Sequence, residues 1–297
     1  GRSTEEMSVD EAVTLMRGPK GTAVQLRLRR GGTGREYEVQ LVREIIKVPR
    51  VEAKMLPDRI GYIKLAGFSE TSVQDLDRAL AELDRQRMAG LILDLRYNPG
   101  GLMNIAVEIA QRFIQEGPIL YVSGRNQRER QSFYASGRAS HPDLPMVVLV
   151  NQGSASASEI LAGALKDHKR ALLVGTKTFG KGLVQTIIPL HDGSALSLTT
   201  QKWFTAGGHS IALEGITPDV VVKNPGDDEM ARELEKIKRR EEGAAGKEQE
   251  QAGPEQNPAP KAAGAEAGRD YQLERAVQLL KERLAEQAER RELRKAS

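Results

Sequence analysis

A short apolar run that gives way to serines and then to a helical pattern restricts the fold of this chain more than any other feature. The run Met146–Val150 is entirely apolar and is typical of a buried strand. After Asn151–Ser158, apolar residues recur at 160, 161, 164 and 165, which is the spacing of a helix. The serines therefore lie where a strand turns into a helix. Backbone N–H groups at such a turn lack partners and carry the positive end of the helix dipole, which stabilises an oxyanion.

Two more strand patterns precede this turn, and each is followed by a helical pattern. The strands are predicted at Ile60–Leu65 and Gly90–Leu95. Strands that alternate with helices predict right-handed βαβ crossovers and a mostly parallel sheet, hence an α/β fold. Sites on such sheets lie beyond the carboxyl ends of the strands. Because the loops Asn98–Gly101 and Ser154–Ser158 both lie there, we expect them to face each other.

The first residues have a pattern of their own. A helix is expected at 8–18, and two strands at 23–30 and 37–42 flank a glycine turn. One helix and two strands are too few for an independent core. Their order resembles the C-terminal half of a PDZ domain, so we expect residues 1–44 to be a partial PDZ domain. The resemblance implies that the loop that binds a substrate carboxylate precedes Gly1.

A charged segment separates the main domain, predicted at residues 45–223, from the end of the chain. Residues 224–268 contain almost no large apolar side chains, which predicts a disordered charged linker. Apolar periodicity returns afterwards and predicts a helix over residues 269–297. This helix either docks on the main domain or is a solvated tail. Its periodic residues are Leu273, Ala276, Val277, Leu280 and Leu284.

Composition excludes several classes of function. The 44 basic and 41 acidic residues leave a net charge of +3, which demands neither nucleic acid nor an anionic membrane as a partner. The chain has no cysteine, which excludes disulfides, thiol catalysis and cysteine metal sites. No apolar run approaches the length of a membrane span, and the first residues lack the pattern of a signal peptide. We expect a protein that binds no nucleic acid.

Three serines at the strand-to-helix turn are candidates for a nucleophile. Ser156 and Glu159 have the spacing of a capping box, in which the two side chains bond to N–H groups of the first helical turn. Ser154 and Ser158 are equally able to cap a helix. The residues alone therefore leave each serine open as a helix cap or as a nucleophile.

A serine nucleophile needs a base, and histidine is its usual partner. No spacing recommends any of the four histidines, and we expect each to be an ordinary surface or turn residue: His141, His168, His191 and His209. A lysine serves instead when burial lowers its pKa. Lys181 is the candidate, because it is expected to be buried by the apolar residues close to it in the sequence. These residues are Phe179, Leu183 and Val184.

The same lysine belongs to a second pattern. Gly175–Lys181 matches the first seven positions of a phosphate-binding P-loop. At the eighth position Gly182 replaces the Ser or Thr that would ligate Mg²⁺, and Leu183–Ile188 is strand-like where a helix should begin. We therefore expect that the protein does not bind a nucleotide.

Three motifs, taken in order, resemble the carboxyl-terminal processing proteases of the S41 family. They are Asn-Pro-Gly-Gly at Asn98–Gly101, the serine-rich Gly153–Glu159, and Thr-Phe-Gly-Lys-Gly-x-x-Gln at Thr178–Gln185. The resemblance runs from about Gly1 to Val222. It implies an S41 protease core of the ClpP/crotonase-like kind, preceded by the partial PDZ-like segment and followed by the linker and the C-terminal helix.

The resemblance also implies roles for individual residues. Ser156 is expected to be the nucleophile, Lys181 the general base, and Gln185 a residue that positions the lysine. The implied oxyanion hole consists of the backbone N–H groups of Ala157 and of the turn Gly100-Gly101. One departure affects the local substrate groove: Trp203–His209 replaces the Tyr-Tyr-Thr-Pro-Ser-Gly-Arg common in the family.

The function implied by the resemblance is that of a serine endopeptidase with a Ser-Lys dyad and no metal or cofactor. Such an enzyme cleaves unstructured proteins at or near their C-termini through an acyl-enzyme. Its expected partners are unfolded protein or peptide C-termini and a membrane-anchored or regulatory protein, and its expected location is the bacterial periplasm or cell envelope. The alternative is a catalytically silent PDZ-containing protein that binds peptides as a scaffold. The intact Ser156, Lys181 and Gln185 favour the enzyme.

Overall fold

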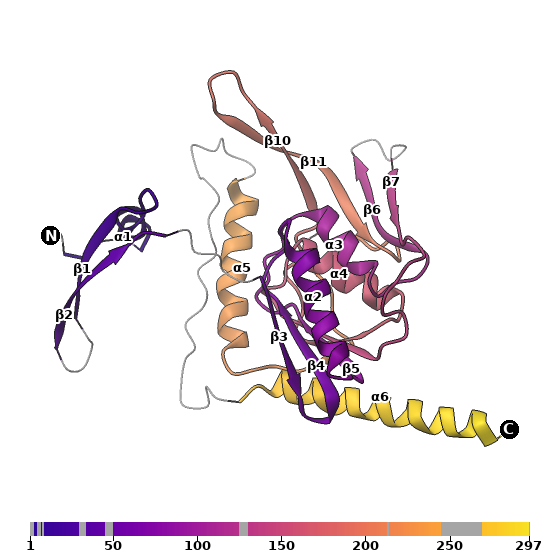
Figure 1. Cartoon of the computed structure of the whole chain (residues 1–297). Helices are drawn as coiled ribbons and strands as arrows, with labels where there is room; N and C mark the ends of the chain where they lie inside the picture. The colour runs from indigo at the N-terminus through magenta and orange to yellow at the C-terminus, as the bar shows by residue number, and fades with distance from the viewer. Residues whose placement is uncertain are drawn as a thin grey trace. The chain divides into compact units, whose positions relative to one another are not determined.

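The computed structural model describes residues 3–4, 7, 9–29, 34–44, 50–124, 130–212, 214–244 and 269–296. The chain divides into two compact units, residues 1–49 and residues 50–297, which Figure 1 colours from indigo to yellow along the sequence. The predicted boundary between residues 44 and 45 lies a few residues before this division.

The N-terminal unit contains one helix and one hairpin, in the predicted order. Helix α1 (Val9–Met16) is followed by strands β1 (Ala23–Arg29) and β2 (Glu36–Val42), which pair antiparallel. The guanidinium of Arg43 donates to the carbonyls of Met16 and Ala23, so it joins the end of the helix to the hairpin. None of the described residues of this unit is fully buried, as expected for a segment with too few elements for a core.

A six-stranded sheet forms the centre of the second unit, with the strand order β12-β9-β8-β5-β4-β3. Every neighbouring pair is parallel except β3 and β4, so the predicted mostly parallel sheet is confirmed. Central strands β5 and β8 are buried along their whole length, which explains their continuous apolar runs. The strands are β3 (Val51–Leu56), β4 (Ile60–Leu65), β5 (Gly90–Asp94), β8 (Met146–Val150), β9 (Leu172–Gly175) and β12 (Val220–Val221), with a 3-10 turn at Pro57–Arg59 between β3 and β4.

Alternate residues of each central strand enter different hydrophobic cores, one on each face of the sheet. In β5, Leu91 and Leu93 pack with three helices, whereas Ile92 lies in the cluster that contains Leu280 of helix α6. Figure 1 shows α6 in yellow alongside β4 and β5. The C-terminal helix therefore docks on the main domain. The helices are α2 (Ser72–Arg85), α3 (Met103–Ala110) and α4 (Ala157–Asp167) on one face and α6 (Tyr271–Ala296) on the other.

A second, antiparallel sheet has the strand order β10-β11-β6-β7. Its strands are β6 (Pro118–Gly124), β7 (Arg130–Tyr134), β10 (Leu183–Pro189) and β11 (Ala195–Thr205). Asp192 stabilises the turn between β10 and β11: its Oδ1 accepts hydrogen bonds from the N–H and hydroxyl of Ser194. Figure 1 shows this hairpin extending away from the six-stranded sheet, and β10 is an edge strand.

The predicted linker is shorter than expected, because residues 227–244 form helix α5 (Asp227–Ala244). Acidic residues occupy its first turn, where they interact favourably with the helix dipole. Asp227 and Met230 are buried, and the Asp227 carboxylate accepts a hydrogen bond from Asn224 N at 2.7 Å. Composition alone did not indicate these contacts. Residues 245–268 of the predicted linker lie outside the described residues.

Among the described helices, none is both long enough and apolar enough to cross a bilayer.

Candidate active site

The two loops predicted to face each other are in contact, and Asn98 holds them together. The carbonyl oxygen of Asn98 accepts hydrogen bonds from Ala155 N at 3.0 Å and from Ser158 Oγ at 2.8 Å. Its side-chain Nδ2 donates to Leu65 O at the end of β4, at 2.7 Å. Asn98 is fully buried. The loop after β5 is thus fixed both to the neighbouring strand and to the serine-rich turn.

Gly100 lies directly against this turn. A Cβ atom added to Gly100 would lie 2.9 Å from the backbone nitrogen of Ala157 and 2.9 Å from the Cβ of Ser156. The φ of Gly100 is 102°, which residues with a side chain rarely adopt. Only glycine therefore allows the two loops to approach this closely.

The three expected oxyanion donors are in different situations. Gly100 N donates to Asn98 Oδ1 at 2.9 Å, so this N–H is engaged within the turn. The N–H groups of Gly101 and Ala157 donate to no acceptor within the described part of the chain. Ala157 is the first residue of α4, and the N–H groups of a first helical turn have no acceptor within the helix.

The structure separates the three serines that the sequence leaves equivalent. Ser154 and Ser158 are fully buried, and their hydroxyls donate to the carbonyl oxygens of Leu95 and Asn98. Both hydroxyls therefore hold the loops in place. Ser156 is only half-buried, so its side chain reaches the surface where the two loops meet.

The backbone of Ser156 is strained. Its φ of 53° and ψ of −114° lie outside the regions favoured by residues with a side chain. Such a conformation costs about 1–3 kcal/mol and persists only where the surrounding structure holds it. Strained turns between a strand and a helix also present the nucleophile in α/β-hydrolases. Of the three serines, Ser156 is the one with a φ between +20° and +160°.

Glu159 connects the two parts of the candidate site. Its Oε2 accepts hydrogen bonds from Ser156 N and Lys181 N, both at 2.9 Å. Its Oε1 accepts from Thr178 Oγ1 at 2.5 Å and from Gly180 N at 2.7 Å. Burial raises the pKa of Glu159, and these four hydrogen bonds oppose that effect. The capping-box spacing predicts the bond to Ser156 but gives no sign of the other three.

The expected burial of Lys181 is wrong: Lys181 is exposed. Leu183 is 41% exposed, and Phe179 and Val184 are only half-buried. Lys181 precedes β10, the edge strand of its sheet, and the apolar residues close to it in the sequence do not cover its side chain. The Lys181 backbone is nonetheless fixed, since its carbonyl accepts a hydrogen bond from Nε1 of the buried Trp203 at 3.1 Å. Trp203 belongs to the segment that departs from the family pattern.

Gln185 lies in β10, opposite Thr199 of β11. Its side chain is outside the part of the chain that the structure describes. Leu183–Pro189 is a strand, so the helix that follows a phosphate-binding loop is replaced here by β10. Among the described residues, no group of three or more His, Asp or Glu side chains is placed to hold a metal ion.

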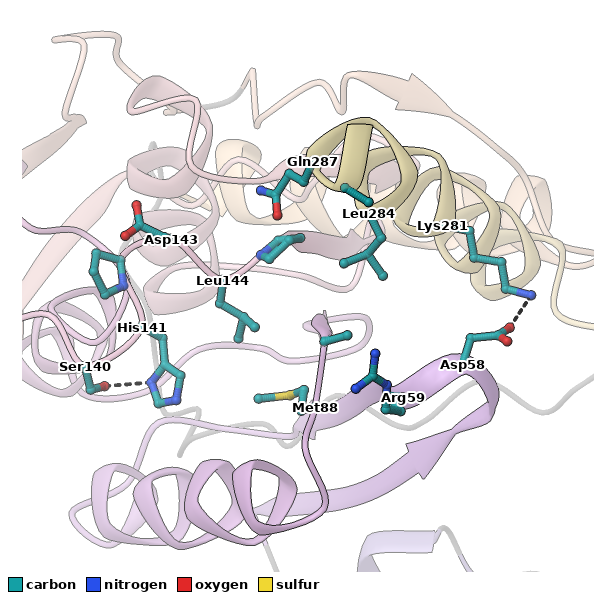
Figure 2. Close-up of a pocket in the computed structure, with 14 residues that line it drawn as sticks. Asp58, Arg59, Met88, Ser140, His141, Asp143, Leu144, Lys281, Leu284 and Gln287 are labelled. Carbon is teal, nitrogen blue, oxygen red and sulfur yellow. Dashed lines mark hydrogen bonds and ion pairs between the residues drawn. The ribbon is translucent and has the colours of Figure 1, made fainter. Parts of the chain in front are cut away.

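A cavity of about 880 Å³ lies at the other end of the parallel strands (Figure 2). It lies between α6 and the segments that precede β5 and β8, and its lining includes Met88, His141, Leu144 and Leu284. His141 bonds to Ser140 Oγ through Nδ1 and to Asp84 through Nε2. None of the predicted site residues lines this cavity.

Comparison with known proteins identifies relatives of this chain. Residues 59–222 match the model of peptidase family S41. The chain is 43% identical over 229 residues to a carboxy-terminal-processing protease of Bartonella bacilliformis. This match covers 76% of this chain and 52% of the relative. It is 46% identical over 229 residues to a carboxyl-terminal-processing protease of Synechocystis sp., which covers 76% of this chain and 53% of the relative.

A solved structure is also similar: the photosystem II D1 C-terminal processing protease. The two chains share 34% sequence identity with a TM-score of 0.56, over 75% of this chain and 61% of the other. The chain spans about half the length of the two curated relatives.

Proposed function

The chain belongs to peptidase family S41, and we propose that it is a serine endopeptidase with Ser156 as the nucleophile and Lys181 as the general base. The observation that carries this proposal is the situation of Ser156. It is half-buried, strained and placed against Gly100, whereas the hydroxyls of Ser154 and Ser158 are used in structural hydrogen bonds.

The proposed reaction has two stages. Ser156 Oγ attacks the carbonyl carbon of the scissile peptide while the neutral amine of Lys181 takes the hydroxyl proton. The tetrahedral intermediate collapses when Lys181 gives this proton to the leaving amine, and an acyl-enzyme remains. A water molecule then attacks the ester in the same way and releases the acid and the free serine. In this proposal Gln185 positions the lysine.

The oxyanion of both tetrahedral intermediates needs N–H donors that are already oriented. Gly101 and Ala157 supply them in our proposal, because their N–H groups have no acceptor within the described residues. Gly100 N completes the hole when it exchanges its bond to Asn98 Oδ1 for one to the oxyanion. The N-terminus of α4 adds the positive end of a helix dipole at the same place.

The proposed substrates are unstructured proteins cleaved at or near their C-termini. The relatives are named carboxy-terminal-processing proteases, which supports cleavage at the C-terminus. We propose that residues 1–44 are the C-terminal half of a PDZ domain; the order of α1, β1 and β2 supports this assignment. A membrane-anchored or regulatory partner and a location in the bacterial periplasm or envelope remain predictions from the family resemblance.

One observation favours the alternative, a catalytically silent peptide-binding protein. Lys181 is exposed, whereas a lysine that accepts a proton is normally shielded from water. In the enzyme proposal, the bound substrate chain supplies this shielding when it covers the edge of β10.

The test is cleavage of an unfolded protein such as casein by the wild type, by Ser156→Ala and by a control variant, Ser136→Ala. Ser136 is exposed and lies outside both loops. We expect cleavage by the wild type and the control and none by Ser156→Ala. A fluorophosphonate probe should react with Ser156 of the wild type, and mass spectrometry should locate the label on that residue. Absence of both cleavage and labelling in the wild type would support the silent protein.

A further inference from the structure

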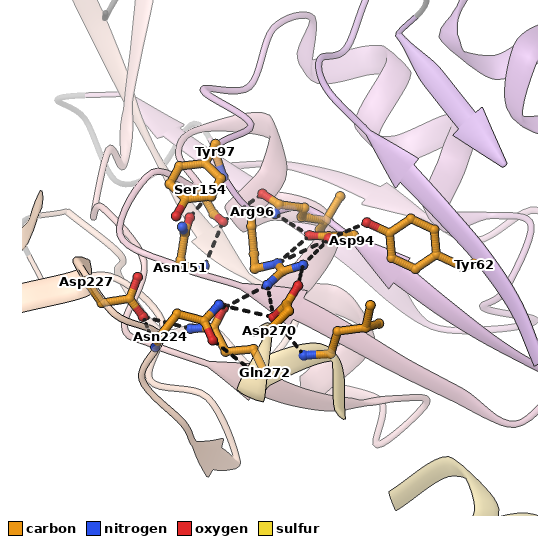
Figure 3. Close-up of polar contacts among 12 residues, drawn as sticks. Tyr62, Asp94, Arg96, Tyr97, Asn151, Ser154, Asn224, Asp227, Asp270 and Gln272 are labelled. Carbon is orange, nitrogen blue, oxygen red and sulfur yellow. Dashed lines mark hydrogen bonds and ion pairs between the residues drawn. The ribbon is translucent and has the colours of Figure 1, made fainter. Parts of the chain in front are cut away.

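A buried cluster of charged and polar side chains joins the start of α6 to the end of β5 (Figure 3). Arg96 is 8% exposed and lies two residues before Asn98. Its guanidinium donates to Asp94 through Nε at 3.0 Å and Nη2 at 2.6 Å, and to Asp270 through Nη1 at 2.7 Å and Nη2 at 2.8 Å. Asp270, just before α6, thus reaches the active-site loop from 174 residues away in the sequence.

Both carboxylates hold this guanidinium. Asp94 already accepts hydrogen bonds from Arg96 N and, at 2.7 Å, from Tyr62 OH. Asp94 therefore holds one side of the guanidinium. Asp270 holds the other side, and its carboxylate also caps α6 by accepting from Leu273 N at 3.0 Å.

Gln272 extends the connection to α5. Its Oε1 accepts from Arg96 Nη1 at 3.1 Å, and its Nε2 donates to Asp227 Oδ2 and Val222 O, both at 2.9 Å. Gln272 is 1% exposed. The first turns of the two C-terminal helices and the end of β5 therefore share one hydrogen-bonded network.

The second active-site loop joins the same network. Gln152, four residues before Ser156, donates through Nε2 to the backbone carbonyl of Asp227. Gln152 also accepts a hydrogen bond from Thr176 Oγ1. The start of α5 thus touches the segment that leads into the serine-rich loop, while the start of α6 touches Arg96, two residues before the Asn98–Gly101 loop.

We infer that Asp270 and Gln272 are positioning residues for the active site, because they hold Arg96 and, through it, the loop that carries the proposed oxyanion donors. Neither α5 nor α6 lies within residues 59–222, the part matched by the family model. The inference rests on the proposed function. A displacement of the loop by a fraction of an ångström moves Gly101 N away from the oxyanion, and such misplacement costs catalysis more than binding.

The experiment compares Asp270→Asn with Glu274→Gln in the full chain. Glu274 is an exposed carboxylate in the first turn of the same helix and pairs with Arg269. We expect Asp270→Asn to lower kcat about ten-fold or more with little change in KM. Hydrogen exchange should become faster at residues 96–101 and stay slow at residues 276–284. The control should match the wild type in all these measurements.

Asp270→Glu is the conservative variant, and it should recover part of the lost kcat because it restores the carboxylate. Gln272→Met tests the same network without removing a charge and should again speed exchange at residues 96–101. Unchanged kcat and unchanged exchange at residues 96–101 in Asp270→Asn and Gln272→Met would overturn the inference. If the wild type cleaves nothing, the proposed function fails, but the exchange measurement still decides whether α6 holds the loop.

Discussion

Glu159 and Lys181 are joined by a hydrogen bond from the lysine backbone nitrogen to Oε2 of the glutamate, 2.9 Å long, across 22 residues of sequence. The same oxygen atom accepts the backbone N–H of Ser156. One buried carboxylate therefore fixes the backbones of both proposed members of the dyad. The Glu159 carboxylate is important because its two oxygen atoms accept hydrogen bonds from four donors.

Glu159→Gln should weaken both activity and stability. The glutamine amide group keeps the shape of the side chain but presents N–H donors to two of the four donors around it. Each buried donor left without an acceptor costs about 1–3 kcal/mol. We expect a loss of about 2–6 kcal/mol in the free energy of unfolding, measured in urea, and a clear fall in kcat. Glu108→Gln, at an exposed position of α3, should change neither.

Gly100→Ala should reduce activity because its methyl group would occupy the space beside Ala157 N, 2.9 Å away. Removal of an oxyanion donor typically costs about 100-fold or more in kcat, and we expect an effect of this size. Gly137→Ala is the matched control: Gly137 also has a positive φ, of 75°, but an added Cβ meets nothing within 4 Å. Equal activities of the two variants would show that the methyl group at Gly100 does not disturb catalysis.

Lys181→Arg should be as inactive as Lys181→Ala, although it conserves the positive charge. Arginine keeps its proton at any accessible pH, so it cannot accept one from Ser156. The losses at Ser156 and Lys181 should also be non-additive, because residues that act as one unit lose the same transition-state stabilisation only once. Lys177→Arg, at an exposed position of the same loop, should retain full activity. Substantial cleavage by purified Lys181→Arg would contradict the assignment of the base.

Leu280→Ala should destabilise the main domain, because Leu280 is fully buried between α6 and the sheet. Its side chain lies close to Gly90, where an added Cβ would be 3.1 Å from Leu280 Cδ1. Truncation of such a leucine costs about 2–5 kcal/mol of unfolding free energy. Leu293→Ala on the same helix should cost almost nothing, since Leu293 is 72% exposed. Similar urea midpoints for the two variants would show that α6 contributes little to the core.

The contribution of Asp270 to stability should disappear in acid. Burial would raise the pKa of Asp270, but the hydrogen bonds and charge of Arg96 hold it below its usual value of 3.8. The contribution of Asp270 to stability is therefore present above pH 3.8. It is lost as the pH falls through the lower pKa that Asp270 has in the folded protein.

The Asp270 side chain is 37% exposed, so Asp270→Asn should cost only about 1–2 kcal/mol at neutral pH. The difference between wild type and variant should shrink as the pH falls below 3.8. Burial raises the pKa of Asp227, and the charge of Asp270 adds to that rise, so Asp270→Asn also alters the opposite pH dependence that Asp227 contributes. A difference that persists in acid would show that Asp270 does not act through its charge.

The sheet and the meeting of the two loops were predictable from the sequence, because both depend on local patterns. Apolar runs such as Met146–Val150 predict central strands, and parallel strands bring the loops after them to the same edge. The choice among the three serines was not predictable. It depends on the carbonyl oxygens of Leu95 and Asn98, which come from a distant strand and loop.

The errors have the same origin. Helix α5 has the composition of a linker, and its start is held by contacts with Gln152 and Asn224 rather than by apolar periodicity. Lys181 is exposed because the apolar residues close to it in the sequence do not cover its side chain. Neither the order of strands in a sheet nor a partner such as Asp270 for Arg96 is encoded in local spacing.

The division of the sheet between two cores has a consequence for biosynthesis. Ile92, Val147, Leu149 and Val174 pack against α6, which leaves the ribosome after all the other described helices and strands. Until then one face of the nascent sheet has no cover. The contacts that cover it join residues far apart in the sequence, and such contacts form slowly. Apolar surface exposed during this interval attracts chaperones and promotes aggregation. Translation that stops before residue 271 should therefore leave a chain that associates with itself, even though both proposed dyad residues have already been made.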